Sequence, residues 1–225
     1  MILHKHKTVF IHIPKCGGTS IVNQYARQHG VSEYKFASQT WSQGFATACV
    51  RGYRSHSKHY MYVTNLHAPY DQYALQYGSD WKFVAQVRHP YTRFRSAWSH
   101  LSDLVLVKTP FKDWVPRAIE SMREGKWHNC IDDMDALYEL HIMKPSFDPS
   151  IIMKPQWTFV RLPEVEIHKL ENLTIFKEIG LEGFENDKWN VSKNKFQPTH
   201  EWTDENKKLI YDYYKRDFEE FYYGA

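Results

Sequence analysis

The residues near the N-terminus favour a loop that binds an anion. The apolar run 9–13 is rich in β-branched and aromatic residues, which predicts a short buried strand. Pro14 ends this strand because its ring removes a backbone donor, and Gly17 and Gly18 then permit a tight turn close to a ligand. A helix is expected over residues 21–28. Strand, turn and helix N-terminus together direct N–H groups and a positive dipole end at one point.

Three side chains add to this loop. Lys15 supplies a full positive charge at its edge, while Thr19 and Ser20 supply hydroxyl groups and suit the N-cap position of the helix. The order differs from the usual nucleoside triphosphate loop, G-x-x-x-x-G-K-[ST], because Lys15 precedes the glycines. An ordinary turn between strand and helix also uses glycine and a capping threonine, so the loop alone leaves the ligand open.

A second anion site is predicted at the end of a second strand. Residues 81–87 form the next clear strand, and Arg88 at its end can bind a tetrahedral anion through two N–H groups. The helix expected over 91–101 has apolar residues at i, i+3, i+4 and i+7, with Arg93 and Ser96 off that face. Ser96 can donate a further hydrogen bond. Two such sites on one sheet suggest one ligand that is phosphorylated at both ends.

The whole chain has the size and composition of one globular domain. Its 225 residues are 42% hydrophobic and 24% charged, and Lys plus Arg exceed Asp plus Glu by 29 − 26 = 3. This excess is too small to imply nucleic-acid binding but suits an anionic small molecule. Three scattered cysteines predict neither a disulfide framework nor a metal site. Without an apolar leader or membrane span, a cytoplasmic location is expected.

The remaining pattern predicts strands alternating with helices. We expect short strands at 61–64 and 173–176, and helices at 71–77, 111–123, 131–143 and 203–221. Residues 32–60 and 190–200 have the composition of polar loops. The economical interpretation is one α/β domain over residues 1–225, a P-loop-like three-layer α/β/α fold with a central, mainly parallel sheet.

At both anion sites the sequence resembles the sulfotransferases that use 3′-phosphoadenosine 5′-phosphosulfate. Segment 10–20 is similar to their 5′-phosphosulfate loop, and segment 87–98, with the pattern Arg-x-Pro-x-x-Arg-x-x-Ser, to their 3′-phosphate site. The likeness is closest to the carbohydrate branch, particularly the heparan sulfate 6-O- and 2-O-sulfotransferases. It implies in-line transfer of a sulfuryl group to an acceptor hydroxyl on a carbohydrate, without a metal, releasing adenosine 3′,5′-bisphosphate.

The resemblance also implies a role for each matching residue. The residues that would hold the 5′-phosphosulfate are Lys15, Cys16, Gly17, Gly18, Thr19 and Ser20. Lys15 would also stabilise the charge on the leaving oxygen, whereas packing in the turn is the role expected for the Cys16 side chain. Arg88 and Ser96 would hold the 3′-phosphate. The loop that folds over the nucleotide would contribute Asn190, Ser192 and Lys193.

An alcohol acceptor also needs a base. Segment 65–71 resembles the Leu-His-Ala segment of the 6-O-sulfotransferases, in which the histidine is the base, so His67 is the leading candidate. An imidazole with the reference pKa of about 6.5 is largely neutral at pH 7 and can accept a proton. His12, inside the first strand, and His89, beside Arg88, are weaker candidates.

Two other classes of function stay open at this stage. One is a kinase or NTPase with a variant phosphate loop, although no lysine follows the glycines and no acidic Mg²⁺ site is evident at a strand end. The other is a non-catalytic module that binds RNA or another polyanion through the basic run 51–58. The sulfotransferase interpretation predicts a nucleotide donor and a hydroxyl acceptor, with neither nucleic acid nor membrane as a partner. Its acceptor is a sugar, a tyrosine or a small alcohol.

Overall fold

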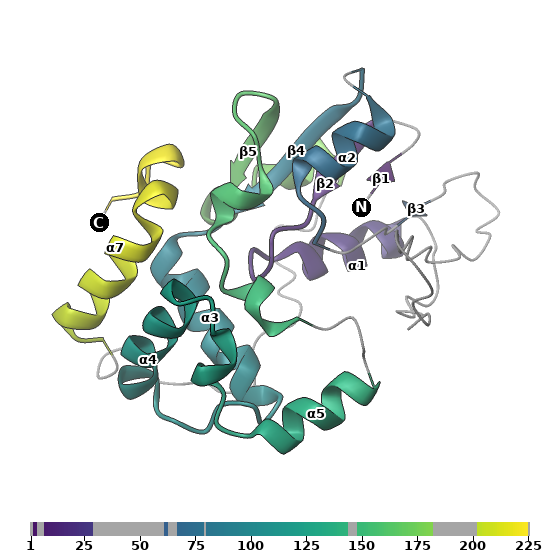
Figure 1. Cartoon of the computed structure of the whole chain (residues 1–225). Helices are drawn as coiled ribbons and strands as arrows, with labels where there is room; N and C mark the ends of the chain where they lie inside the picture. The colour runs from purple at the N-terminus through teal and green to yellow at the C-terminus, as the bar shows by residue number, and fades with distance from the viewer. Residues whose placement is uncertain are drawn as a thin grey trace. The chain divides into compact units, whose positions relative to one another are not determined.

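The structure, a computed structural model, describes residues 2–3, 7–28, 61–62, 67–78, 80–143, 148–181 and 202–224. The chain separates into two compact units, and Figure 1 labels the five strands and most of the α-helices. The first unit comprises residues 1–88 and 156–190, and the second comprises residues 89–155 and 191–225. Among the described residues, no helix is both long enough and apolar enough to cross a membrane. The single domain over residues 1–225 stays a prediction.

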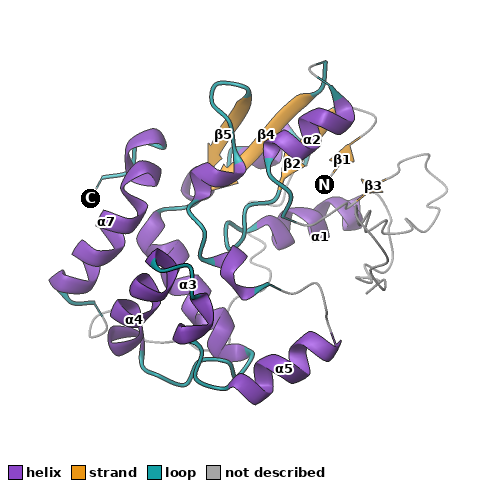
Figure 2. Ribbon diagram, in the orientation of Figure 1, coloured by secondary structure: helices purple, strands orange, loops and turns teal. Residues whose placement is uncertain are grey.

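A five-stranded sheet with the order β3-β1-β2-β4-β5 forms the centre of the first unit (Figure 2). Its strands are β1 (Ile2–Leu3), β2 (Thr8–Ile11), β3 (Met61–Tyr62), β4 (Lys82–Val87) and β5 (Val165–Lys169). β2, β4 and β5 run parallel to one another, whereas β1 pairs antiparallel with both β2 and β3. The α/β class with a mainly parallel sheet is therefore confirmed.

Helices cover both faces of this sheet. Phe10 of β2 is paired with Val84 of β4, and both pack against α1 (Gly18–Gln28) and α6 (Ile175–Glu178) in one buried cluster. Phe83 points to the opposite face, because side chains alternate along a strand. There its ring meets Tyr70 of α2 (Tyr70–Tyr77), with 4.9 Å between centroids. Helices on both sides of the sheet make the expected three layers.

The strand expected at residues 173–176 is wrong. Leu173 adopts a left-handed conformation, with φ of 54°, which ends a 3₁₀ turn, and α6 begins two residues later. The last strand is instead β5, where Val165 and His168 are buried. A four-residue apolar run fits a buried helix as well as a strand, and here the backbone at Leu173 excludes the strand.

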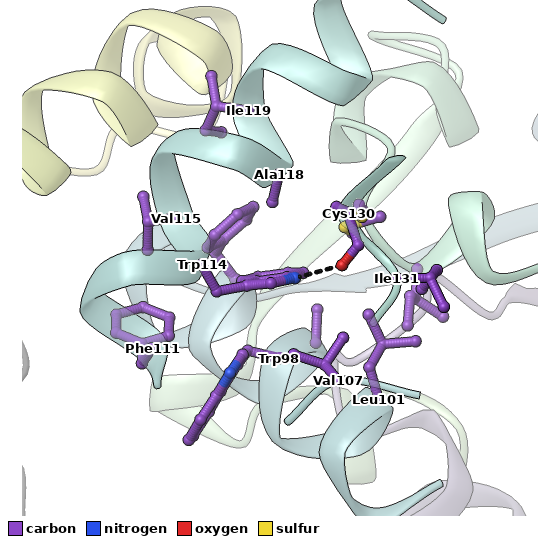
Figure 3. Packing of buried hydrophobic residues seen from close by; sticks show 14 of the residues in the cluster. Trp98, Leu101, Val107, Phe111, Trp114, Val115, Ala118, Ile119, Cys130 and Ile131 are labelled. Atoms are coloured by element: carbon purple, nitrogen blue, oxygen red, sulfur yellow. Dashed lines mark hydrogen bonds between the residues drawn. The ribbon is translucent and has the colours of Figure 1, made fainter. Parts of the chain in front are cut away.

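The α-helices that the structure describes in the second unit are α3 (Pro90–Asp103), α4 (Phe111–Arg123), α5 (Met134–Met143) and α7 (Asp204–Glu220). Their apolar faces enclose one core, to which α3 contributes Phe94, Ala97, Trp98 and Leu101 as the sequence predicts. Trp114 of α4 is fully buried, and its indole N–H donates to the Cys130 carbonyl at 2.9 Å (Figure 3). This hydrogen bond satisfies the indole donor of a large side chain in an apolar core.

Local signals set where these helices begin. Pro90 occupies the first turn of α3, as expected. α5 begins at Met134 rather than at Ile131, because the Asp133 carboxylate accepts the Ala136 N–H at 2.8 Å and ends the preceding turn. Thr203 caps α7 in the same way, accepting the N–H of Asn206 at 3.1 Å.

Candidate active site

The loop between β2 and α1 joins the end of a strand to the start of a helix, as the sequence predicts. α1 begins at Gly18, so Thr19 and Ser20 lie in its first turn, and the predicted N-cap role is wrong for both. The Gly17 carbonyl instead accepts the N–H of Ser20 at 3.0 Å. Among the described residues, no backbone carbonyl accepts the N–H groups of Gly18 or Thr19. These donors, at the positive end of a helix, are suited to an anion.

The backbone of this loop is strained at its centre. Lys15 has φ of 64° and Gly17 has φ of 78°, so both adopt the left-handed conformation. Glycine takes this conformation freely, but for an ordinary L-residue such as Lys15 it costs about 1–2 kcal/mol. Strain of this kind concentrates at functional sites, because the surrounding contacts must hold the backbone in place. Lys15, which the resemblance assigns to the leaving oxygen, is therefore the residue of the loop with a strained backbone.

Buried amide side chains hold the loop against the end of β4. Gln86 donates from Nε2 to the Cys16 carbonyl at 2.6 Å, and the Arg88 guanidinium donates to the Lys15 carbonyl at 3.3 Å. Gln156 lies between the two segments, bonded to the Arg88 backbone and to the Cys16 thiol. The structure thus brings the Arg88 guanidinium into contact with the backbone of Lys15, and the anion-binding roles of both residues stay predictions.

The Cys16 side chain faces away from any ligand of the loop. Its thiol is 1% exposed and donates to Gln156 Oε1 at 3.1 Å, with the Pro14 carbonyl at 3.6 Å. Packing in the turn is therefore the role of this side chain. Any contribution of Cys16 to donor binding, as the resemblance implies, comes from its place in the loop.

His67 is held by the end of β2. Its Nδ1 lies 2.9 Å from the carbonyl oxygen of His12, and because a carbonyl can only accept, Nδ1 must carry the proton of this hydrogen bond. In the neutral ring the remaining nitrogen, Nε2, then has a lone pair. This is the tautomer that a general base needs. The two imidazole rings also meet edge to face, with 4.8 Å between centroids.

His12 itself is buried and neutral. Burial lowers the pKa of His12 well below 6.5, and the nearby charges of His67 and Lys15 lower it further. The ring is 4% exposed and packs against Gly18, where an added Cβ would overlap it. A buried ring is a poor proton acceptor. His12 therefore contributes its backbone carbonyl and the packing surface of its ring rather than the base.

The second unit contains Arg93 and Ser96 of the predicted 3′-phosphate motif. Ser96 is half-buried on α3. Arg93, although off the apolar stripe, is only 1% exposed and donates to the Ile152 carbonyl at 3.2 Å. Its guanidinium therefore supports the fold of this unit. His89 lies among the rings of Tyr91, Phe218 and Tyr223, which favours a packing role over that of a base.

Part of the prediction falls on residues that the structure does not describe. Asn190, Ser192 and Lys193, expected over the nucleotide, lie outside the described residues. The basic run 51–58 of the polyanion-binding alternative also lies outside them. Gln86 and Gln156, conversely, were missed from the sequence. A glutamine within the apolar run 81–87 was a usable signal, whereas nothing near Gln156 indicated its role.

Another polar cluster lies elsewhere in the first unit. Glu166, His168 and Glu178 place three ligand-type atoms within 4.8 Å of one another. Lys82 contacts both glutamates, at 2.8 Å from Glu166 Oε2, and this hydrogen bond is the main cause that lowers the pKa of Glu166. The Lys82 ammonium group offsets one of the two carboxylate charges, and His168 Nε2 lies 2.9 Å from Glu166 Oε1. The cluster is an ion-pair network that joins β4, β5 and α6.

Comparison with known proteins found one match. A model of the sulfotransferase family matches residues 1–148, about two thirds of the 225 residues. No curated protein and no solved structure matched the chain. The matched region includes the strained loop, His67 and Arg88.

Proposed function

The chain belongs to the sulfotransferase family, and from this premise we propose that it transfers a sulfuryl group from 3′-phosphoadenosine 5′-phosphosulfate to a hydroxyl group of a carbohydrate. The observation that carries the proposal is the loop at the start of α1, where Lys15 and helix N–H groups lie next to Arg88. Lys15 and the helix N–H groups fit the 5′-phosphosulfate of such a donor, and Arg88 fits its 3′-phosphate. The carbohydrate acceptor rests on the resemblance of segment 65–71 to the 6-O-sulfotransferases.

Each residue has a distinct task in the proposed in-line displacement. His67 accepts the proton of the acceptor hydroxyl at Nε2, while that oxygen forms its bond to sulfur. The bond between sulfur and the 5′-phosphate oxygen breaks, and adenosine 3′,5′-bisphosphate leaves. Lys15 and the N–H groups of Gly18 and Thr19 stabilise the charge that builds on the leaving oxygen. Arg88 holds the 3′-phosphate and so fixes the line of attack.

The resemblance adds further donor contacts to the proposal. Ser96 donates a hydrogen bond to the 3′-phosphate, and the segment over the nucleotide contributes Asn190, Ser192 and Lys193. No metal ion is required, because Lys15, Arg88 and the helix N-terminus provide the positive charge that the reaction needs.

Three alanine variants test these tasks. His67→Ala should lower kcat by about 10²-fold or more, which is the effect expected when a general base is lost, and leave the Kd of adenosine 3′,5′-bisphosphate within about twofold.

Lys15→Ala should lower kcat by about 10²–10³-fold, because charge on the leaving oxygen is no longer stabilised. Arg88→Ala should weaken bisphosphate binding by about tenfold or more, through loss of charged hydrogen bonds. Transfer is measured with labelled donor and a panel of saccharides, tyrosyl peptides and small alcohols, and binding by calorimetry.

Matched controls separate these effects from general damage. His128→Ala and Lys112→Ala remove the same side-chain types from exposed positions of the second unit and should leave both kcat and Kd unchanged. Full turnover in His67→Ala would remove His67 from the mechanism. Failure of the unmodified protein to bind the bisphosphate, or phosphoryl transfer from ATP with Mg²⁺, would overturn the proposed function.

A further inference from the structure

Gln156 lies where the chain returns to the first unit. The chain leaves this unit after Arg88 and re-enters it at Gln156, after the 67 residues 89–155 of the second unit. The Gln156 side chain forms hydrogen bonds with both the N–H and the carbonyl of Arg88. Oε1 accepts the Arg88 N–H at 2.8 Å, and Nε2 donates to the Arg88 carbonyl at 2.9 Å. A single amide therefore fixes both peptide groups that flank this arginine.

The same amide also reaches the loop that carries Lys15. Gln156 Oε1 accepts a hydrogen bond from the Cys16 thiol at 3.1 Å, in addition to the one from Arg88. From the other side, Gln86 donates to the Cys16 carbonyl. Gln156 is completely buried, so these bonds form without competition from water. The side chain connects the two segments that hold opposite ends of the proposed donor.

We propose that Gln156 is a positioning residue, which sets the direction of the Arg88 side chain relative to the loop of Lys15. The inference rests on the proposed function, because it assigns Arg88 to the 3′-phosphate. Only a group that both donates and accepts can make this pair of bonds to one backbone. Loss of either bond removes a partner of the partly buried Arg88 backbone and lets this backbone turn.

Two variants at this position test the inference. Gln156→Met keeps the size of the side chain but removes every hydrogen bond, so bisphosphate binding should weaken by about tenfold or more. The donor KM should rise by a similar factor while the acceptor KM stays constant, because the acceptor does not depend on Arg88. A residue that merely supports the fold would lower the amount of active protein without changing the ratio of the two KM values.

Gln156→Glu gives a second readout, which depends on pH. The protonated carboxylic acid can donate to the Arg88 carbonyl and accept the Arg88 N–H, as the amide does, whereas the carboxylate can only accept. Burial raises the pKa of a carboxyl group, so the protonated form should be populated at mildly acidic pH. Relative to the unmodified protein, the variant should bind the bisphosphate almost normally at pH 5.5 and about tenfold or more weaker at pH 8.

The controls make each outcome decisive. Thr158→Glu adds the same charge to an exposed position of the same 3₁₀ turn, Gln156–Phe159, and should show no such pH dependence. If Gln156→Met does not fold, the pH series of Gln156→Glu still decides the question. Bisphosphate binding by the unmodified protein together with equal binding by both Gln156 variants would overturn this inference alone. Absence of binding by the unmodified protein would instead overturn the proposed function.

Discussion

The two histidines at the loop have opposite environments, and this difference separates their roles. His67 is half-buried, and its proton is fixed on Nδ1 by the carbonyl of His12. His12 is 4% exposed, and its own Nδ1 has no hydrogen-bond partner within the described residues. A charged His12 would therefore lie in a buried place without an opposite charge bonded to it. The fold fixes the proton of one imidazole on Nδ1 and keeps the second imidazole as neutral packing.

The neutral state of His12 predicts how stability depends on pH. Burial, followed by the charges of His67 and Lys15, lowers the pKa of His12 in the folded protein, whereas the unfolded chain has a pKa near 6.5. Below pH 6.5 the unfolded chain therefore binds the proton more readily. Stability is fully present above pH 6.5 and falls as the pH drops toward the folded pKa, by up to about 1.4 kcal/mol per pH unit.

Urea denaturation between pH 7.5 and pH 5 checks this expectation. His12→Gln removes the titrating group, so the free energy of unfolding should depend less on pH in the variant than in the unmodified protein. His128→Gln, at an exposed position, is the matched control and should keep the original slope. Equal slopes in the unmodified protein and His12→Gln would show that His12 does not carry this dependence.

Among the elements, the close approach of α1 to the end of β2 is the most constrained. Gly18 opens α1 directly against the His12 ring, so a side chain there and the ring compete for one space. Gly17 is required for a different reason, its left-handed φ of 78°. Conformation is therefore a constraint at Gly17, where a Cβ would also lie 3.0 Å from Gln86 Nε2, whereas lack of space is the constraint at Gly18.

Substitutions at Gly18 test this separation. Gly18→Ala should destabilise the protein by about 1–3 kcal/mol, because the new Cβ forces the His12 ring or the helix start to move. In a His12→Ala background the same change should be neutral or stabilising, since alanine favours a helix by about 1 kcal/mol over glycine. Gly224→Ala, with open space around it, should stay within about 0.5 kcal/mol. Urea denaturation of the unmodified protein, Gly18→Ala, His12→Ala and the double variant gives a double-mutant cycle. An unchanged loss of stability on Gly18→Ala in the His12→Ala background would contradict the prediction.

The strands that carry the two loops could be predicted from the sequence, because each is a short apolar run that ends at a proline or an arginine. β2 and β4 both follow this pattern, and Pro90 marks the start of α3 correctly. β5 was missed, although residues 165–168 alternate apolar and polar side chains, a pattern that indicates a half-buried strand. The contacts of Gln156, by contrast, were hidden, because they join residues 68 and 140 positions apart in the chain. Periodicity reports burial within an element, not hydrogen bonds between distant segments.

At the scale of the whole molecule, the connectivity favours one cooperative domain. The chain passes between the two compact units three times, after residues 88, 155 and 190. Neither unit is a continuous stretch of sequence, and each has its own buried cluster. Unfolding of the second unit would release both flanking segments at Arg88 and Gln156, where the proposed site is anchored. We therefore propose that the two units unfold together, as the predicted single domain requires.

Native-state hydrogen exchange tests this cooperativity. The slowest amides of β4, in the first unit, and of α4, in the second, should report the same free energy of opening, because both exchange only through global unfolding. Adenosine 3′,5′-bisphosphate at about 100 times its Kd should raise both values by the same amount, about 2.7 kcal/mol. A rise confined to β4, or a lower free energy in α4 without ligand, would show that the units unfold separately.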